Sequence, residues 1–224
     1  MYFYPNYKTE IVINEVEKYP IAENYREAFI IKMLPLILRA NDEITEERSI
    51  VLDFHKGNYL HQEKIVELMT KYRANDIYDL IYKVDYIPIS MALSQAIVES
   101  GWGGSRIFKE ANAVFGQHSY SGIGIRSVDG SGRMFASFDS LLDSTRGYMR
   151  NLNSHPAYAN FRKLRAKMRN SNKLEVTKLV NTLTKYSSRK NQYTNQVNQI
   201  IKTNNLTRYD ADFYLMDTKN YCIM

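Results

Sequence analysis

Glycine is unevenly distributed along the chain, and this distribution constrains the fold more than any other feature. Nine of the ten glycines lie between residues 101 and 147, and none follows. Because glycine inside a helix costs roughly 1 kcal/mol relative to alanine, the segments on either side of this region are expected to be helical. The glycine-rich segment itself is expected to carry turns. The sequence therefore predicts a mainly α chain with one small β insert.

Both flanks show the apolar spacing of amphipathic helices. The first segment, 24–41, contains Pro35, which predicts a kink. A separate helix is expected to begin near Thr45 and to stop near Gly57. Ser90 is expected to cap the helix that precedes the glycine cluster. Further helices are expected at 61–74, 139–155, 156–170, 172–186 and 192–206.

The middle of the chain, residues 113–138, alternates between apolar and polar residues. Glycines at positions 122, 124, 130 and 132 interrupt it. This pattern predicts a small β-hairpin or an irregular flap. The expected fold class is mainly α, formally α+β, with a β-hairpin lobe and an N-terminal helical extension.

Several classes of site and segment are excluded by composition. Cys222 is the only cysteine, so an internal disulfide and a cysteine-based zinc site are excluded. The four histidines show no metal-ligand spacing, and we expect no metal and no cofactor. No run approaches the ~18 unbroken apolar residues of a membrane span. The start, MYFYPNYKTE, lacks the basic and apolar regions of a secretory signal.

Positive charge is concentrated in residues 101–174. Twelve lysines and arginines stand there against four acidic residues, a net charge of +8. Such a surface favours an anionic partner, such as nucleic acid, acidic lipid or a carboxylate-bearing wall polymer, and a merely solvated face is the alternative. Arg162, Arg165 and Arg169 share one side of a predicted helix. This spacing would suit a nucleic-acid ridge, but no recognised nucleic-acid motif surrounds it.

The stretch VESGWGGSR, residues 98–106, ends a predicted helix with a glutamate in an unusual place. Glu99 lies in the last turn, where the helix dipole disfavours negative charge by roughly 0.3–1 kcal/mol. The same field keeps a carboxyl protonated, as a general acid requires. Gly101 is a natural left-handed residue after the helix, and Gln95 shares the face of Glu99. Glu99 is therefore a candidate acid, and an exposed glutamate without a role is the alternative.

Three aromatic residues have two interpretations each. Trp102 either wedges its loop against the core or offers a flat face to a sugar ring. Tyr186 and Tyr193 flank SSRKNQ between the last two expected helices. Tyrosines there either pack in the core or orient a substrate in a cleft, and residue spacing leaves both interpretations open.

Residues 84–117, VDYIPISMALSQAIVESGWGGSRIFKEANAVFGQ, resemble the signature of the bacterial glucosaminidase domain, glycoside hydrolase family 73, and in particular its Bax-type branch. Three pieces carry the resemblance: ESGWG from Glu99, the pattern Asn112-x-x-Phe115-Gly116, and two tyrosines separated by six residues. The similarity runs from about residue 28 to residue 206, most of the chain.

The resemblance implies a lysozyme-like fold, with helices around a cleft and a small β-lobe. It also implies hydrolysis of β-1,4 bonds after N-acetylglucosamine in peptidoglycan. The family's catalytic acid falls on Glu99, and its helper tyrosine falls on Tyr186. With Gln95, Trp102 and Phe115 lining the groove, the residues expected to bind substrate are Gln95, Trp102, Asn112, Phe115, Gly116 and Tyr193.

One feature departs from the family's pattern, in which many members carry a second glutamate in the β-lobe. This chain has no glutamate between Glu110 and Glu175, and Asp129 is the only acid of the hairpin segment. Asp129 is therefore a candidate second catalytic group. A water held by Tyr186 and backbone groups, or assistance from the substrate's N-acetyl group, are the alternatives, and inversion versus retention stays open.

These observations predict a monomeric peptidoglycan hydrolase of the periplasm, cell envelope or exterior, with no nucleic-acid partner. Its expected parts are an N-terminal extension (1–83), the glucosaminidase domain (84–206) and a tail (207–224). A lytic transglycosylase and a non-catalytic glycan-binding relative are the rival hypotheses, and a nucleic-acid binder is a remote one.

Overall fold

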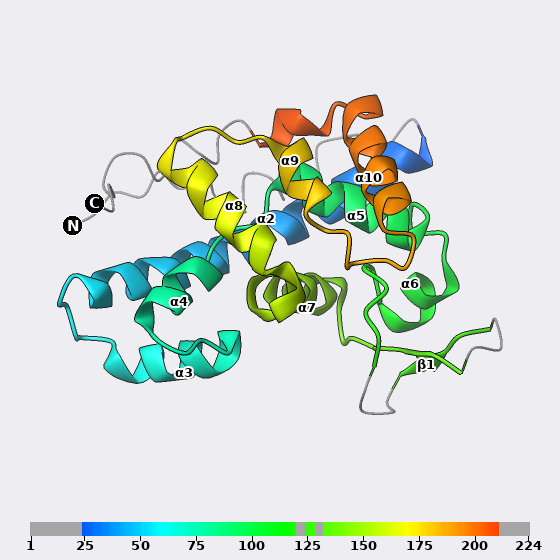
Figure 1. The fold of residues 1–224 in the computed structure, drawn as a ribbon. Coiled ribbons are helices and arrows are strands. Elements are labelled where there is room, and N and C mark those ends of the chain that lie inside the picture. Colours follow the sequence, from blue (N-terminus) through cyan, green and yellow to red (C-terminus); the bar gives the residue numbers. More distant parts are fainter. Residues whose placement is uncertain (1–23, 120–123, 129–131, 211–224) are drawn as a thin grey trace.

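The structure is a computed structural model that describes residues 24–119, 124–128 and 132–210. Figure 1 shows a helical body with a small hairpin at one end and the helices α3 and α4 at the other. The described residues are mostly helical with one small two-stranded sheet, so the predicted fold class is confirmed. The elements are α2 (Tyr25–His55), α3 (Gln62–Tyr72), α4 (Ile77–Lys83), α5 (Ile89–Ser100), α6 (Arg106–Ala111), β1 (Ile125–Arg126), β2 (Met134–Phe135), α7 (Leu141–Ser154), η1 (Pro156–Tyr158), α8 (Ala159–Asn170), α9 (Val176–Asn181), α10 (Asn191–Thr203) and η2 (Leu206–Tyr209).

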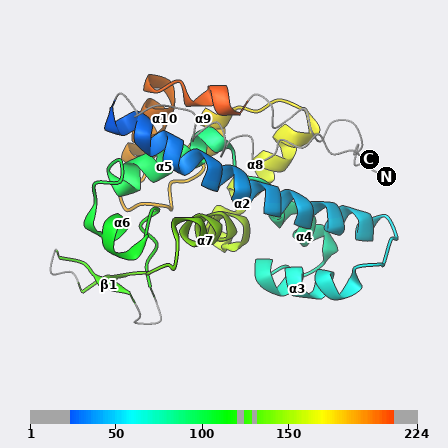
Figure 2. The same ribbon diagram turned by 180° about the vertical axis from the view of Figure 1, so that it is seen from behind.

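The N-terminal helix α2 is continuous, so the new start expected near Thr45 is wrong. Thr45 donates its hydroxyl to the carbonyl of Asn41 inside the helix, at 2.9 Å. Pro35 lies within the helix, and no glycine interrupts it before its end near Gly57. One face of α2 packs on α5 and α7, and this tertiary packing stabilises a helix that local signals would divide. Figure 2 shows α2 crossing the back of the molecule.

Helix α5 is the centre of the fold. Every residue from Ile89 to Ile97 is buried. The hydrophobic cluster around it joins Phe29 of α2, Leu152 of α7 and Val197 of α10. A helix that is covered on all sides has a fixed axis, because any shift would open cavities against several neighbours. The cluster continues across residue 83, and the division into an extension and a catalytic domain stays a prediction.

The start of α5 is capped from a distant part of the chain. Ser90 was expected to be the N-cap, but that position is held by Pro88, which makes no side-chain cap. Asp210 instead accepts a hydrogen bond from the backbone N–H of Ser90 at 3.0 Å. The expectation fails because a buried helix start cannot reach water, and a carboxylate brought in by the fold satisfies it.

The chain just before α5 is held by arginines from two other helices. Asp85, only 2% exposed, pairs with Arg48 of α2 at 4.0 Å, with Arg165 of α8 at 3.3 Å, and with Arg169. Arg165, at 0% exposed, also donates to the carbonyls of Asp85 and Tyr86 at 3.1 and 2.8 Å. Burial raises the pKa of Asp85, but the three arginines lower it by more, so its pKa lies below its usual range. Burial lowers the pKa of Arg165 to about 10.

The arginines of α8 share one side, as expected, but that side faces the core. Arg162 is buried and donates to the carbonyls of Leu152 and His155 at 3.0 and 2.9 Å. Arg165 and Arg169 pair with Asp85, as described above. The interpretation of these arginines as a nucleic-acid ridge is therefore corrected. Helical periodicity shows which residues share one side of a helix, but not whether that side faces solvent or the core.

The glycine-rich segment forms the predicted small hairpin. Strand β1 pairs antiparallel with β2, with Ile125 opposite Phe135 and Arg126 opposite Met134. Asp129, the candidate second catalytic group, lies outside the described residues, as does most of the expected tail. Within the described ranges, no helix combines the length and apolar character that a bilayer span requires.

Removing the central carboxylate is expected to destabilise the fold strongly. Asp85→Ala should lower the free energy of unfolding by about 3–5 kcal/mol, because the buried Arg165 loses its counter-charge. Urea unfolding followed by circular dichroism measures this loss. Glu110→Ala is the control, since it breaks an exposed pair with Arg106 (2.9 Å) and should cost about 1 kcal/mol or less. Equal losses of unfolding free energy in the two variants would contradict the proposed contribution of Asp85 to stability.

Candidate active site

The candidate acid Glu99 stands in the last turn of α5, where the backbone turns sharply away. The helix ends at Gly101 in the left-handed region, with φ 57°, and Gly103 follows with φ 76°. A side chain on Gly103 would meet the ring of Phe29 at 3.1 Å. The glycines therefore let the chain leave the helix end and pack on α2 without covering Glu99.

Gly116 brings the backbone of a second segment against the Glu99 carboxyl. A Cβ atom at Gly116 would lie 3.1 Å from Glu99 Oε2, and its φ of 62° also favours glycine. This segment is fixed by Asn112, the left-handed C-cap of α6, whose Nδ2 donates to the carbonyl of Phe138 at 2.9 Å. Glycine at 116 thus allows the close approach that partly buries Glu99.

A chain of hydrogen bonds orients the hydroxyl that meets Glu99. Tyr148 donates its hydroxyl to Gln95 Oε1 at 2.7 Å, and Gln95 Nε2 donates to the Tyr193 hydroxyl at 2.8 Å. The Tyr193 hydroxyl interacts in turn with the Glu99 side chain, and this interaction lowers the pKa of Glu99. Because the Tyr193 oxygen already accepts from Gln95, its proton is directed at the carboxyl. Gln95 therefore joins Tyr148 of α7 to Tyr193 of α10.

Tyr186 lies beside this chain within a group of aromatic rings. Its ring stacks on Tyr193, with centroids 5.4 Å apart and planes at 9°. Its hydroxyl donates to the backbone carbonyl of Phe115 at 3.1 Å, and Phe115 stacks on Tyr148 at 3.9 Å. With its proton engaged on Phe115, the Tyr186 oxygen can still accept a hydrogen bond.

The surroundings of Glu99 favour its protonated form. Burial raises the pKa of Glu99, while the Tyr193 hydrogen bond and the charge of Arg189 lower it by less, so the net shift is upward. Arg189 lies over the Tyr193 ring, 5.7 Å from its centroid. The tyrosines are neutral here, because burial and the nearby Glu99 raise the pKa values of Tyr186 and Tyr193. A neutral carboxyl with a donor ready for its anion is suited to general acid chemistry.

The structure brings together six of the nine sequence-predicted site residues. These are Gln95, Glu99, Phe115, Gly116, Tyr186 and Tyr193. Gln95 and Phe115 are 0% and 1% exposed, so the expectation that their side chains line the groove is corrected. Both lie in the core and contact tyrosines of the site.

Two further predicted residues lie elsewhere. Trp102 makes edge contacts with Tyr25 and Phe29 of α2, at 6.4 and 6.1 Å between ring centroids. Asn112 holds the backbone near Gly116 through its bond to Phe138, as described above. Neither has a contact that places it at the Glu99 carboxyl.

Sequence reasoning missed Tyr148 and Arg189. Tyr148 lies on α7 among core residues and carries no local signal of its role, which depends on its bond to Gln95. Arg189 could have been found, because it is a cation between two candidate tyrosines in SSRKNQ. Among residues 24–119, 124–128 and 132–210, no three histidine, cysteine, aspartate or glutamate side chains gather as a metal site would require.

Three comparisons relate this chain to known proteins. The profile of the glucosaminidase family, described as mannosyl-glycoprotein endo-beta-N-acetylglucosaminidase, matches residues 74–206. Protein Bax of Escherichia coli (strain K12) is 30% identical in an alignment of 195 residues that covers 81% of this chain and 70% of Bax. The catalytic domain of the autolysin Auto from Listeria monocytogenes is similar over 92% of this chain and 100% of its own, with 18% identity and a TM-score of 0.47.

Removing the Tyr193 hydroxyl is expected to raise the pKa of Glu99 further. Tyr193→Phe deletes a donor that stabilises the carboxylate, and burial then acts with less opposition. Carbon-13 NMR titration of the glutamate carboxyls measures the shift. Tyr59→Phe, at an exposed tyrosine, is the control and should leave Glu99 unchanged. An unchanged or lowered pKa in Tyr193→Phe would show that the hydroxyl does not donate to Glu99.

Proposed function

Because the chain belongs to the glucosaminidase family, we propose that it is a peptidoglycan hydrolase, an endo-β-N-acetylglucosaminidase that cleaves the β-1,4 bond after N-acetylglucosamine. The observation that carries this proposal is the partly buried Glu99, whose pKa is raised and whose carboxyl meets the Tyr193 hydroxyl. The substrate lies in the bacterial wall, so we place the protein in the periplasm, the cell envelope or the exterior.

In the proposed reaction, the protonated Glu99 gives its proton to the glycosidic oxygen while the bond from the sugar's anomeric carbon to that oxygen breaks. The leaving sugar departs as an alcohol, and positive charge develops on the ring that remains. Glu99 becomes a carboxylate at this moment. The Tyr193 hydroxyl and the charge of Arg189 stabilise that anion, and both interactions already act on Glu99 in the resting site.

A water molecule then adds to the anomeric carbon and releases a proton to an activating carboxylate or to solvent, and Glu99 regains a proton from solvent. The group that holds or activates this water is a separate proposal. Tyr186 is suited to hold the water, because its oxygen retains acceptor capacity beside the site. Asp129 in the hairpin segment is the alternative, and the substrate's own N-acetyl group is another. If Asp129 activates water, Asp129→Asn should lose most of the activity; if Tyr186 does, Tyr186→Phe should.

One rival activity has a specific observation in its favour. A lytic transglycosylase needs a single acid, and this chain has no glutamate between Glu110 and Glu175. In that reaction no water adds, and the glycan ends in an anhydromuramoyl ring. The products therefore distinguish the two activities.

Replacing the acid should abolish cleavage without unfolding the protein. Glu99→Gln keeps the shape of the side chain but cannot give up a proton in the same way, so the rate should fall by about 10²–10⁴. Digests of purified peptidoglycan analysed by mass spectrometry measure the loss. Wild type should release muropeptides with reducing N-acetylglucosamine ends, and Glu110→Gln on the exposed face of α6 should behave like wild type. Normal release by Glu99→Gln, or anhydromuramoyl ends from wild type, would refute the proposal.

The pH dependence of cleavage should follow the protonation of Glu99. A general acid works while it is protonated, so the rate falls as pH rises through its pKa. Since that pKa is raised above the ordinary value of 4.5, activity should persist at a higher pH than an ordinary glutamate allows. In Tyr193→Phe this falling limb should move further upward in pH, because the lost donor had lowered the pKa. A limb that stays in place in a steady-state pH–rate profile would contradict the assignment of Glu99 as the acid.

A further inference from the structure

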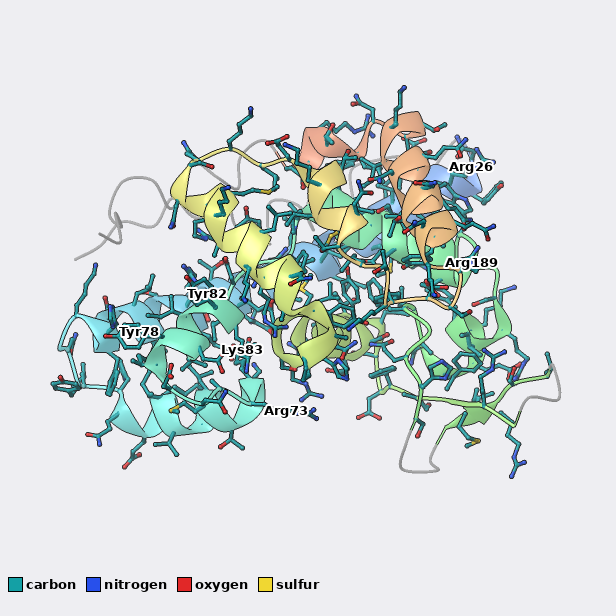
Figure 3. All side chains as sticks on the ribbon, in the orientation of Figure 1. Arg26, Arg73, Tyr78, Tyr82, Lys83 and Arg189 are labelled. Atoms are coloured by element: carbon teal, nitrogen blue, oxygen red, sulfur yellow. The ribbon has the colours of Figure 1, made fainter. Side chains whose placement is uncertain are left out.

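A hollow of about 290 Å³ lies apart from the Glu99 carboxyl, between α10, the start of α2 and the turn after α5. Its lining has three carboxamides, a hydroxyl, an indole and a guanidinium: Gln196, Gln199, Asn204, Thr203, Trp102 and Arg26. Figure 3 places Arg26 and Arg189 toward opposite ends of α10. The hollow therefore lies along the outer side of the helix whose inner side carries Tyr193.

The aromatic wall of the hollow is held in a fixed orientation. Trp102 has a φ of 59°, a conformation that non-glycine residues adopt only where the surroundings enforce it. Edge contacts with Tyr25 and Phe29 set the plane of its ring, and the Arg26 guanidinium lies 5.4 Å from the ring centroid. A fixed indole is a large amphipathic surface that binds a ligand without losing much side-chain entropy.

Apart from the Arg26 guanidinium, which lies over the Trp102 ring, the polar groups of the hollow are uncharged and suit a ligand with hydroxyl and amide groups. Carboxamides carry donors and an acceptor, and Thr203 adds a hydroxyl. One oxygen lone pair of Gln196 is taken by Arg189, and one N–H of Asn204 is donated to the carbonyl of Ile200 at 2.9 Å. No acidic side chain is among the lining residues. We propose that this hollow is a binding subsite for an N-acetylated amino-sugar unit of the glycan strand, away from the bond that Glu99 cleaves. This inference rests on the proposed function.

A pair of residues connects the hollow with the catalytic centre. Gln196, in the lining, accepts a hydrogen bond from Arg189 Nη1 at 2.8 Å. The Arg189 guanidinium lies over the Tyr193 ring, and its charge acts on Glu99. Gln196 therefore links the hollow to Arg189, whose charge acts on Glu99. Longer strands gain contacts that short ones lack, so the subsite favours long substrates.

The single tryptophan of the chain makes the hollow directly observable. Trp102 is the only tryptophan, so intrinsic fluorescence reports on this hollow and on no other indole. Glu99→Gln protein, which does not turn over substrate, is titrated with an oligomer of N-acetylglucosamine. We expect a saturable change in emission. In the same background, Gln199→Ala with Thr203→Ala should weaken binding by about tenfold, because two neutral hydrogen bonds are lost.

Gln192→Ala provides a matched control, since Gln192 is an exposed glutamine of α10 outside the hollow. It should bind the oligomer as the parent does. Steady-state cleavage gives an independent readout: the paired variant should raise KM for long strands while kcat and the KM for short oligomers stay unchanged.

Two results would overturn the subsite. One is binding detected by calorimetry with no change in Trp102 emission. The other is equal affinity in the paired variant and the Gln192→Ala control. If wild type still releases muropeptides in either case, the proposed function stands and the subsite alone fails. If wild type releases none while Trp102 still reports binding, the subsite stands and the hydrolase assignment fails.

Discussion

The ion pairs at Asp85 determine where the central helix begins, and the position of Glu99 depends on that start. Arginines from α2 and α8 converge on a carboxylate that is almost fully buried. Separating such charges would leave them unpaired away from water, at a cost of several kcal/mol, so the segment before α5 has little freedom. Pro88 is the N-cap of α5, and Asp210 accepts a hydrogen bond from the backbone N–H of Ser90 in the first turn of this helix. A helix rises 1.5 Å per residue as a nearly rigid rod, and its fixed start therefore sets the place of Glu99 at its other end.

The fixed position of α5 supports a site where a carboxylate is unfavourable. Burial works against the charge of Glu99, and the last turn of a helix is a poor place for a carboxylate. The bonds that orient it come from different helices: Tyr148 from α7, Gln95 from α5 and Tyr193 from α10. Because all three side chains are buried, they keep their orientation without a substrate. Stability supplied elsewhere in the fold lets this site keep a buried carboxyl whose pKa is raised.

Local signals predicted structure well wherever the decisive contact is local. Gly57 and Gly101 mark the ends of α2 and α5. The same reasoning failed where the partner comes from far along the chain. Thr45 does not begin a new helix, because packing on α5 and α7 keeps α2 helical beyond this residue. Three of the five basic residues of α8, the helix that suggested a nucleic-acid ridge, face inward, because they bind Asp85 and backbone carbonyls that a charge count cannot identify.

The sequence by itself determined the fold class, the glutamate at the end of α5, and the two later tyrosines with six residues between them. Helix ends, glycines and short motifs are encoded within a few residues, so reading the chain in order finds them. Only the tertiary structure decided which way each side chain faces. In the fold, Gln95 faces the core and donates to Tyr193, Tyr148 donates to Gln95, and Trp102 lines a separate hollow beside α10. These outcomes depend on contacts between residues up to 98 positions apart, and helical periodicity specifies a shared face but not the partner that covers it.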